Sequence, residues 1–443
     1  MSMTKAAPKR IAAAVLNALK GGVVPRVGLE YIAVGRAREI DALLKDTEII
    51  GEGGAACRFV VGRYGSGKSF LLQTIRSYAM ERGFAVADAD LSPERRLSGT
   101  HGQGVATYRE LMKNLSVRVS PDGGALPIIL EKWITSVQQS AAEETGLDDF
   151  QSPAFDALVR KRILSIGSEL EGMVNGYDFA RVIVKYWQAY RDADEPAQSN
   201  ALRWLRGEYA SKLEVRRDLD ARAMIDDDNW YEALKLFAAF LVRAGYSGLL
   251  VLIDEVVNLF RIPFRVTRQY NYEKLLSMYN DTLQGKASHL GLVFVVTPQS
   301  LEDTERGIFS YEALRSRLTE GQFADPEARD LLAPIIRISP LTYEEMYVLL
   351  EKLARLHMEL YGYRREIAQE EYVAFLKTEY ERIGASTHIT PRSVIRDFVE
   401  ILNRLYQYSE QTIADIVAAK DTQLTFDEGD SPDDVDGFAS FTL

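Results

Sequence analysis

Hydrophobic positions in the first part of the chain follow two different spacings. A short apolar run at residues 56–61, ACRFVV, ends at a glycine, and residues 69–83 repeat apolar positions every three or four residues. Residues 84–91, FAVADADL, alternate apolar and polar side chains. Runs and alternation are typical of strands, and the longer spacing is typical of a helix. The sequence therefore predicts a strand, a glycine loop, a helix and a second strand.

Two further strands are predicted far downstream. Residues 229–248 carry a helical apolar stripe with Asn229 as the expected N-terminal cap, and the apolar run LLVLIDEV follows. A predicted helix at 272–286 precedes another apolar run, HLGLVFVVTPQ at 289–299. Near-continuous apolar strands that alternate with helices indicate a parallel sheet covered on both faces. We therefore expect an α/β fold.

The remaining segments show helical periodicity without strands. One such segment separates the second and third predicted strands, and another begins near residue 340. Because residues 62–69 match the glycine-loop motif G-x-x-x-x-G-K-[ST], we expect a P-loop core that is interrupted by a helical insertion and followed by a helical lid. The predicted parts are an amphipathic helix (1–27), the first half of the core (28–120), the insertion (121–228), the second half of the core (229–339), the lid (340–420) and a disordered acidic tail (421–443).

Composition is that of an ordinary soluble globular protein. The chain has 443 residues, of which 47% are hydrophobic and 26% charged. Its single cysteine, Cys57, excludes an intrachain disulfide and fits a reducing cytoplasm. Apolar positions of the N-terminal segment recur at helical spacing, which favours an amphipathic helix over a signal peptide. We expect no transmembrane span, because no apolar run reaches about 18 residues.

Charge is distributed unevenly along the chain. The net charge is −11, but residues 421–443 hold seven acidic and no basic residues, so the other 420 residues carry only −4. Basic residues gather in and beside the predicted insertion, near Trp187, Tyr190 and Trp204, which suggests contact with DNA. Solvated helix faces are the alternative. The basic positions are Arg95, Arg96, Arg160, Lys161, Arg162, Arg203, Arg206, Arg216, Arg217 and Arg222.

The stretch GRYGSGKS at residues 62–69 predicts nucleotide binding. It satisfies G-x-x-x-x-G-K-[ST] between a predicted strand and a predicted helix, which is the context this motif requires. Its backbone N–H groups and Lys68 would bind phosphates, and Ser69 would ligate Mg²⁺. A degenerate loop that binds without hydrolysis is the alternative. The expected ATP-binding residues here are Gly62, Gly65, Ser66, Gly67, Lys68, Ser69 and Phe70.

Two carboxylates follow the apolar run LLVLI. Asp254 and Glu255 should emerge at the carboxyl edge of a strand, where open α/β sheets bind their ligands. Asp254 is expected to hold Mg²⁺, and Glu255 to orient and deprotonate the attacking water. An acidic pair that merely ends a strand is the alternative.

Three more residues are candidates for contact with the γ-phosphate. Thr297 ends the strand LVFVVT, where it could contact the phosphate or the attacking water, although threonine is also common there for packing. Arg315 and Arg317 in YEALRSRL could reach the nucleotide of a neighbouring subunit and stabilise transition-state charge. A solvated basic helix face is the alternative for these two arginines.

Two further segments are expected to reach the nucleotide. Arg392 follows Pro391 at the first turn of a lid helix, with Thr390 as the expected cap, and could contact the γ-phosphate. A surface ion pair is the alternative for Arg392. Ile32, Val34 and Gly35 precede a helix that begins near Ala37, as expected of a segment that packs against adenine.

The order of these motifs resembles that of the AAA+ superfamily, nearest its initiator-like branch related to origin-recognition ATPases. The stretches VPRVGLEYIAVGR, LSPERRLSGTHGQGVATYRELMKNL and ITPRSVIRDFVEIL resemble more narrowly the ATP-binding proteins of BREX phage-defence loci, the BrxD-like group. This resemblance covers most of residues 20–410. It implies a bacterial defence role, an operon partner such as a large helicase, and action on or near DNA.

These observations lead to two hypotheses. The first is an ATP-hydrolysing, homo-oligomeric AAA+ protein that loads or regulates a helicase-type partner near DNA. The second is a nucleotide-dependent switch or scaffold that recruits protein partners without contacting DNA. Origin-binding relatives carry a winged helix after the lid, but only about 30 mostly acidic residues follow the lid helix here. We therefore do not expect DNA binding through a C-terminal winged helix, and no helicase motif set follows the glycine loop.

Overall fold

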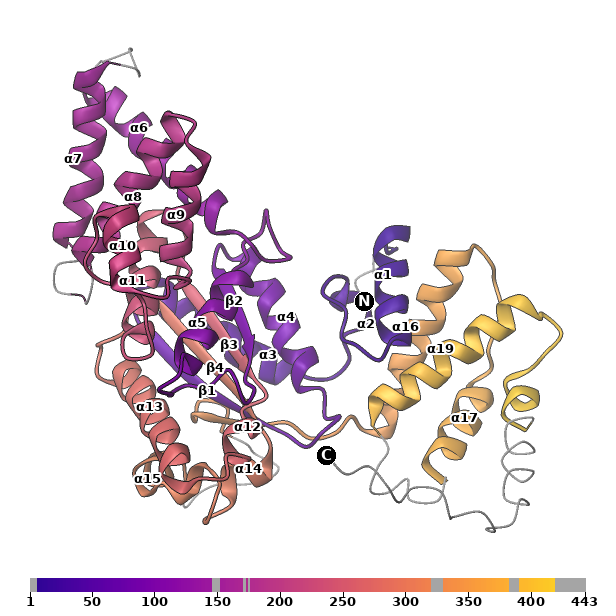
Figure 1. The fold of residues 1–443 in the computed structure, drawn as a ribbon. Helices are drawn as coiled ribbons and strands as arrows, with labels where there is room; N and C mark the ends of the chain where they lie inside the picture. The colour runs from indigo at the N-terminus through magenta and orange to yellow at the C-terminus, as the bar shows by residue number, and fades with distance from the viewer. Residues whose placement is uncertain are drawn as a thin grey trace, which may run out of the picture. The chain divides into compact units, whose positions relative to one another are not determined.

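The chain forms two compact units in this computed structural model (Figure 1). The structure describes residues 6–145, 152–169, 173, 176–319, 330–381 and 390–418. One unit comprises residues 1–35 and 340–443, and the other comprises residues 36–339. The predicted acidic tail (421–443) lies outside the described residues.

Unit 36–339 is built on a parallel sheet of five strands in the order β2-β3-β4-β1-β5. The expected α/β fold with a parallel sheet is confirmed. The first four strands lie where the apolar runs predict them, whereas β5 was not predicted because its three residues are too short a pattern. The strands are β1 Ala55–Val61, β2 Ala85–Asp90, β3 Leu249–Asp254, β4 Leu290–Val296 and β5 Ile335–Arg337.

Alternating residues of the strands enter two separate cores. On β1, Phe59 and Val61 pack in one core and Val60 in the other. The core around Val60 is closed by α3 (Ala37–Gly51) and α4 (Lys68–Glu81). The core around Phe59 is closed by α5, α11 and α13, and it continues into the insertion. Both faces of the sheet are therefore buried, which is why its strands are almost wholly apolar. The three helices are α5 Gln103–Lys113, α11 Trp230–Arg243 and α13 Arg265–Leu283.

Residues 126–219, where the structure describes them, form consecutive helices that each pack against the next one along the chain. Trp187 and Trp204 are 2% and 1% exposed, so their rings are not available at the surface beside the basic residues. Their rings belong to the core because a helical segment of this size must bury large apolar side chains. Tyr190 is 53% exposed. The helices are α6 Leu126–Thr145, α7 Pro153–Glu169, α8 Gly176–Arg191, α9 Glu195–Leu205 and α10 Lys212–Leu219.

The other unit is helical in its described residues. The N-terminal helix α1 (Lys9–Lys20) is amphipathic, as predicted, and packs through Val15, Leu16 and Leu19 against helices from the C-terminal part of the chain. Residues 28–35, which the sequence assigned to the core, are grouped with this unit. Its other helices are α2 Leu29–Ile32, α16 Tyr343–Tyr361, α17 Gln369–Glu381 and α19 Pro391–Gln407.

Two predicted helix caps have different outcomes. Thr390 caps α19, since its side chain accepts a hydrogen bond from the Ser393 N–H. Asn229 precedes α11 but does not cap it, because its Oδ1 accepts a hydrogen bond from the Asp226 N–H instead. The short elements after β3 are α12 Val257–Phe260, α14 Pro298–Glu302, a 3₁₀ turn at Ile308–Ser310 and α15 Glu312–Leu318. Among the described residues, no helix has the length and apolar character needed to cross a bilayer.

Candidate nucleotide-binding site

The glycine loop connects the end of β1 to the start of α4 and requires its glycines. Gly65 and Gly67 have φ of 77° and 88°, a left-handed conformation that other residues rarely adopt. A Cβ on Gly62 would lie 2.4 Å from Ser66 Oγ and 2.8 Å from Ile338 Cγ1. Only glycine fits this close approach. The loop therefore delivers backbone N–H groups to the N-terminus of α4, where anions bind favourably.

Lys68 lies over the loop that carries it. Its Nζ donates hydrogen bonds to the carbonyl oxygens of Gly62 at 2.8 Å and Arg63 at 2.9 Å. Burial lowers the pKa of Lys68, while the nearby charges of Asp254 and Glu255 act in the opposite direction. The ammonium group is thus close to both the loop and the carboxylates that follow β3.

Ser69 and Asp254 are brought together from distant parts of the chain. Ser69 Oγ donates a hydrogen bond to Asp254 Oδ2 at 3.1 Å, and Asp254 Oδ1 accepts one from the Glu255 N–H at 2.7 Å. Burial raises the pKa of Asp254, and the hydrogen bonds from Glu255 and Ser69 partly offset that effect. A hydroxyl and a carboxylate side by side are oxygen ligands of the kind that Mg²⁺ prefers, so the residues fit this ion.

Glu255 begins the turn that follows β3. Its side chain is exposed, and its φ of 55° is in the left-handed region. The Asn258 N–H donates to the Glu255 carbonyl at 2.9 Å, which ties this turn to the start of α12. Non-glycine residues in such conformations occur preferentially at functional sites. The predicted base therefore lies on a constrained turn beside Asp254.

Asp90 is a further carboxylate at this edge that the sequence reasoning did not assign. The register pairs Asp90 with Asp254 at the ends of β2 and β3, and the Leu91 N–H donates to the Asp254 carbonyl at 3.0 Å. Burial raises the pKa of Asp90, and the charge of Asp254 raises it further. An aspartate next to the end of a predicted strand was the available signal, similar to the one that identified Asp254.

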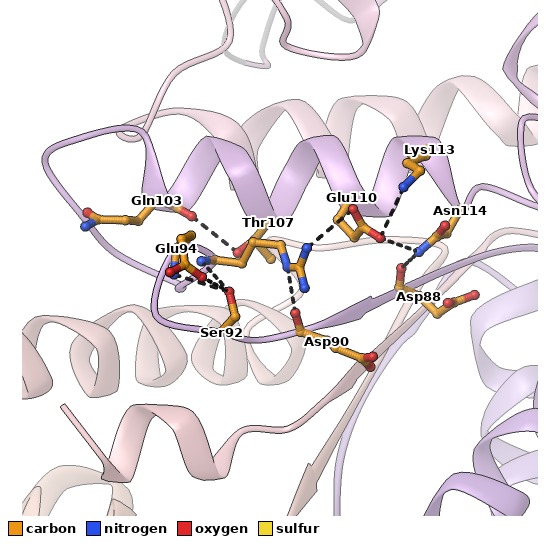
Figure 2. A network of polar contacts seen from close by, with 10 residues as sticks. Asp88, Asp90, Ser92, Glu94, Gln103, Thr107, Glu110, Lys113 and Asn114 are labelled. Carbon is orange, nitrogen blue, oxygen red and sulfur yellow. Dashed lines mark hydrogen bonds and ion pairs between the residues drawn. The ribbon is translucent and has the colours of Figure 1, made fainter. Parts of the chain in front are cut away.

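The loop after β2 is held by polar contacts to α5 (Figure 2). Arg95 Nε donates to the Asp90 carbonyl at 2.9 Å, and its guanidinium lies 3.7 Å from the Glu110 carboxylate. The Thr107 hydroxyl donates to the Arg96 carbonyl at 2.7 Å. Helix α5 therefore fixes the chain next to Asp90 and, through the register, next to Asp254.

Thr297 lies at the carboxyl end of β4, as the sequence predicted. Its Oγ accepts a hydrogen bond from the Ser300 N–H at 3.2 Å and completes a capping box at the start of α14. Thr297 is 9% exposed. Its role toward the γ-phosphate stays a prediction.

A family comparison identifies the chain. The model for the BREX system ATP-binding protein BrxC/D family matches residues 7–421, nearly the whole sequence. The chain belongs to this family. The resemblance to BrxD-like BREX proteins is thereby confirmed, and with it ATP binding and a place in BREX phage defence. No curated protein matches the sequence.

Two arginines of this BrxC/D family member were predicted to reach the nucleotide of a neighbouring subunit, and both are exposed on α15. Arg315 Nη1 lies 3.8 Å from the Glu312 carboxylate, and Arg317 Nη1 donates to the Ala313 carbonyl at 2.8 Å. These are contacts within a helix turn, which leave both guanidinium groups at the surface. Contact with a neighbouring subunit stays a prediction.

Four predicted site residues belong to the other unit. Ile32 is buried in α2, and a Cβ on Gly35 would lie 2.5 Å from Glu345 Oε1, so the segment that includes Val34 packs closely against α16. Arg392 is exposed on α19, with its Cδ 3.6 Å from the position of a Cβ on Gly22. The proposed contacts of these four residues with adenine or the γ-phosphate stay predictions.

Several basic side chains of the insertion pair with neighbouring groups. Arg162 contacts Glu144, and Arg217 Nε lies 2.8 Å from the Asp218 carboxylate. The Arg203 guanidinium lies over the Tyr209 ring at 4.5 Å. These contacts neutralise or cover part of the charge from which DNA binding was predicted.

Proposed function

We propose that this BrxC/D family member hydrolyses ATP in a Mg²⁺-dependent reaction and works as an oligomer on or near DNA, where it loads or regulates a helicase-type partner. The observation that carries the hydrolysis is the hydrogen bond between Ser69 and Asp254. It unites the glycine loop with the acidic strand at one edge of the sheet. A nucleotide bound at the loop would therefore meet both the metal ligands and Glu255.

The binding roles follow from the chemistry of each group. The loop N–H groups and Lys68 would hold the β- and γ-phosphates through hydrogen bonds and charge. Ser69 and Asp254 would hold Mg²⁺, which when bound neutralises the phosphate charge that develops during transfer. In the structure Lys68 donates hydrogen bonds to the carbonyl oxygens of Gly62 and Arg63. Phosphate oxygens of a bound nucleotide would replace these two acceptors.

Glu255 is the group proposed to accept the proton of the attacking water. Its exposed carboxylate follows directly after Asp254, so it borders the same edge without being needed as a metal ligand. A base that orients water contributes typically about 10²–10⁴-fold to the rate. This assignment makes binding and hydrolysis separable by mutation.

The experiment is ATP turnover by the purified chain, with and without single- and double-stranded DNA. Glu255→Gln should bind ATP like the wild type while its turnover falls by about 10²-fold or more. Glu81→Gln, an exposed change at the end of α4, is the matched control and should keep full turnover. Equal turnover in wild type and Glu255→Gln would contradict the proposed base.

DNA supplies a separate test of the second half of the proposal. Binding of DNA, or stimulation of turnover by it, supports action near DNA. If the protein does not bind DNA and its turnover is unchanged when DNA is added, the result favours the nucleotide-dependent switch, which recruits protein partners instead. Partner capture with ATP against ADP then tests the switch, because equal capture in both states contradicts it.

Oligomer formation is testable through Arg315 and Arg317. Because both are exposed, Arg315→Ala and Arg317→Ala should leave ATP binding intact. If one of them reaches a neighbouring site, its loss lowers turnover by about 10³-fold or more. Mixing that variant with Lys68→Ala should restore part of the turnover, because the Lys68→Ala subunits still supply the arginine. Full turnover in both variants would show that neither arginine acts on the nucleotide of a neighbouring subunit.

A further inference from the structure

Arg36 stands where the chain passes between the two units. The chain crosses at Gly35–Arg36 and again at Ser339–Pro340. Arg36 Nη2 donates a hydrogen bond to the Ser66 carbonyl in the glycine loop at 3.0 Å, and it also donates to the Ser339 carbonyl. The guanidinium of Arg36, a residue of the first crossing, thus contacts both the glycine loop and the second crossing.

The Arg36 side chain is buried at this position. It is 8% exposed, and its Nη1 lies 4.0 Å from Glu39 Oε1. A buried guanidinium is stable only where carbonyl oxygens and an opposite charge compensate for its lost hydration. The carbonyls of Ser66 and Ser339 and the carboxylate of Glu39 provide that compensation, so these contacts hold the side chain in one place.

The backbone of Arg36 is in an unfavourable conformation. Its φ is 65°, directly after Gly35 with φ of 66°, and it occupies the position before α3. A long side chain is rarely found in this left-handed region, where glycine fits better. Such a residue persists when the surrounding contacts determine it. The contacts of the guanidinium give a reason for arginine at a position that the backbone alone would assign to glycine.

The bond to Ser66 fixes one peptide of the glycine loop. In a trans peptide the C=O and the following N–H point to opposite sides. A Ser66 carbonyl that faces Arg36 therefore directs the Gly67 N–H away from Arg36. Gly67 is the position before α4, where N–H groups of the loop bind phosphate.

The loop also contacts the end of β5, which leads to the second crossing. The Ile338 N–H donates to the Val61 carbonyl at 2.8 Å, and the Ile338 side chain fills the space where Gly62 lacks a Cβ. Ser66 itself is 1% exposed. A movement of the Ser66–Gly67 peptide would therefore displace Arg36 and residues 338–339, because closely packed groups leave no free space between them.

We propose that Arg36 is a positioning residue that orients the Ser66–Gly67 peptide for phosphate binding and transmits nucleotide occupancy to both connections between the units. The proposal rests on nucleotide binding at the glycine loop. Phosphate that binds the Gly67 N–H shifts the peptide, and the Ser66 carbonyl carries the shift to Arg36 and from there to Ser339. The two crossings thus respond to the same ligand.

The test combines nucleotide affinity with hydrogen exchange, in Arg36→Gly and Arg36→Lys. Arg36→Gly suits the left-handed backbone but removes the guanidinium, and Arg36→Lys keeps a charged donor. Affinity for an N-methylanthraniloyl derivative of ATP should fall about tenfold in Arg36→Gly and less in Arg36→Lys. Arg38→Ala is the control, because Arg38 is exposed two residues further along, in the first turn of α3.

Hydrogen exchange measures whether bound nucleotide protects the two connections, which a merely structural role of Arg36 would not affect. In the wild type and in Arg38→Ala, a saturating non-hydrolysable ATP analogue should slow exchange in the glycine loop and in peptides that span residues 33–40 and 335–342. In Arg36→Gly the analogue should still protect the loop but no longer the two connections. Arg36→Lys should show partial protection, and it serves as the test variant if Arg36→Gly fails to fold.

The outcomes separate this inference from the proposed function. Protection of both connections in nucleotide-saturated Arg36→Gly overturns the role of Arg36, as does a wild type that binds nucleotide without any change at the connections. Neither result affects ATP binding or hydrolysis. A wild type that fails to bind the ATP derivative at all overturns the nucleotide site itself, and the inference with it.

Discussion

Ser69 and Asp254 share a hydrogen bond of 3.1 Å across a sequence separation of 185 residues. Ser69 is the last residue of the glycine-loop motif, and Asp254 is the last residue of β3. The whole helical insertion lies between them in the chain. Their contact shows that the two halves of the candidate nucleotide site meet, although the insertion separates them in the chain.

Removing the Ser69 hydroxyl tests that pairing. Ser69→Ala should lower Mg²⁺-dependent turnover by about 10²-fold or more, because a ligand of the metal that neutralises phosphate charge is lost. Turnover is measured as phosphate release over a range of Mg²⁺ concentrations, and the requirement for Mg²⁺ should rise in the variant. Ser77→Ala is the control, since Ser77 lies on the same helix with its hydroxyl bonded to the Gln73 carbonyl. Normal turnover and Mg²⁺ dependence in Ser69→Ala would remove Ser69 from the metal site.

The ionised carboxylate of Asp254 is expected to reduce the thermal stability of the folded protein. Burial raises its pKa, which means that the ionised carboxylate is disfavoured in the folded state. Asp254→Asn removes the charge at nearly constant size, so without nucleotide or Mg²⁺ its melting temperature should rise by about 1–3 °C. ATP turnover should be lost in the same variant. Asp122→Asn, an exposed change in the same unit, should alter neither property.

The pH dependence of that difference follows from the direction of the shift. A carboxyl group whose pKa is raised by folding binds a proton more tightly in the native state, so protonation stabilises the native state as pH falls through the raised pKa. The stability advantage of Asp254→Asn over the wild type should therefore be largest at neutral pH and shrink at acidic pH. An advantage that is absent at neutral pH, or that grows on acidification, contradicts this account.

The main elements of the site could be predicted because their patterns are local. Apolar runs end at Gly62, Asp254 and Thr297, and each marks the end of a strand at the same edge of the sheet. The glycine-loop motif identifies Lys68 and Ser69 as candidate binding residues by residue type and spacing. Strand β5 has only three residues, which is too few for alternation to become visible.

Other features depend on contacts that no local pattern contains. Arg36 lies 303 residues from Ser339, so its contact with the Ser339 carbonyl follows only from the folded arrangement. Trp187 and Trp204 stand among basic residues in sequence, yet packing places their rings in the core. Asp90 lies beside Asp254 through the register of two strands whose pairing the sequence did not specify. Tertiary packing decides each of these cases.

Asp227 is expected to hold the start of α5 in place. Its carboxylate accepts hydrogen bonds from the Gly102 N–H at 2.7 Å and the Val105 N–H at 2.9 Å, although it lies more than a hundred residues away in the chain. Asp227→Ala should destabilise the protein by about 1–2 kcal/mol, as the loss of a helix cap does. Amide exchange at residues 102–105 should become faster. Asp228→Ala, an exposed neighbour, is the control, and equal exchange in both variants would show that Asp227 is not the cap.

The buried pair of Arg58 and Asp46 is expected to be a main stabilising contact of the unit that contains the sheet. Arg58 Nε and Nη2 each lie 2.6 Å from an Asp46 carboxylate oxygen, and Arg58 Nη1 donates to the carbonyls of Leu332 and Ala333 just before β5. Both residues are less than a tenth exposed. Asp46→Ala leaves a buried cation without its counter-charge, which should cost about 3–5 kcal/mol.

Urea unfolding followed by tryptophan fluorescence measures that cost for this unit alone, because all four tryptophans lie within residues 36–339. Asp41→Ala is the control, since Asp41 pairs with Lys45 at the surface and should contribute less than about 1 kcal/mol. The double change Asp46→Leu with Arg58→Met should recover much of the loss, because it removes both charges together. If Asp46→Ala costs no more than Asp41→Ala, the pair is not a stabilising contact. If the double variant is no more stable than Asp46→Ala, the carbonyl contacts near β5 contribute more than the ion pair itself.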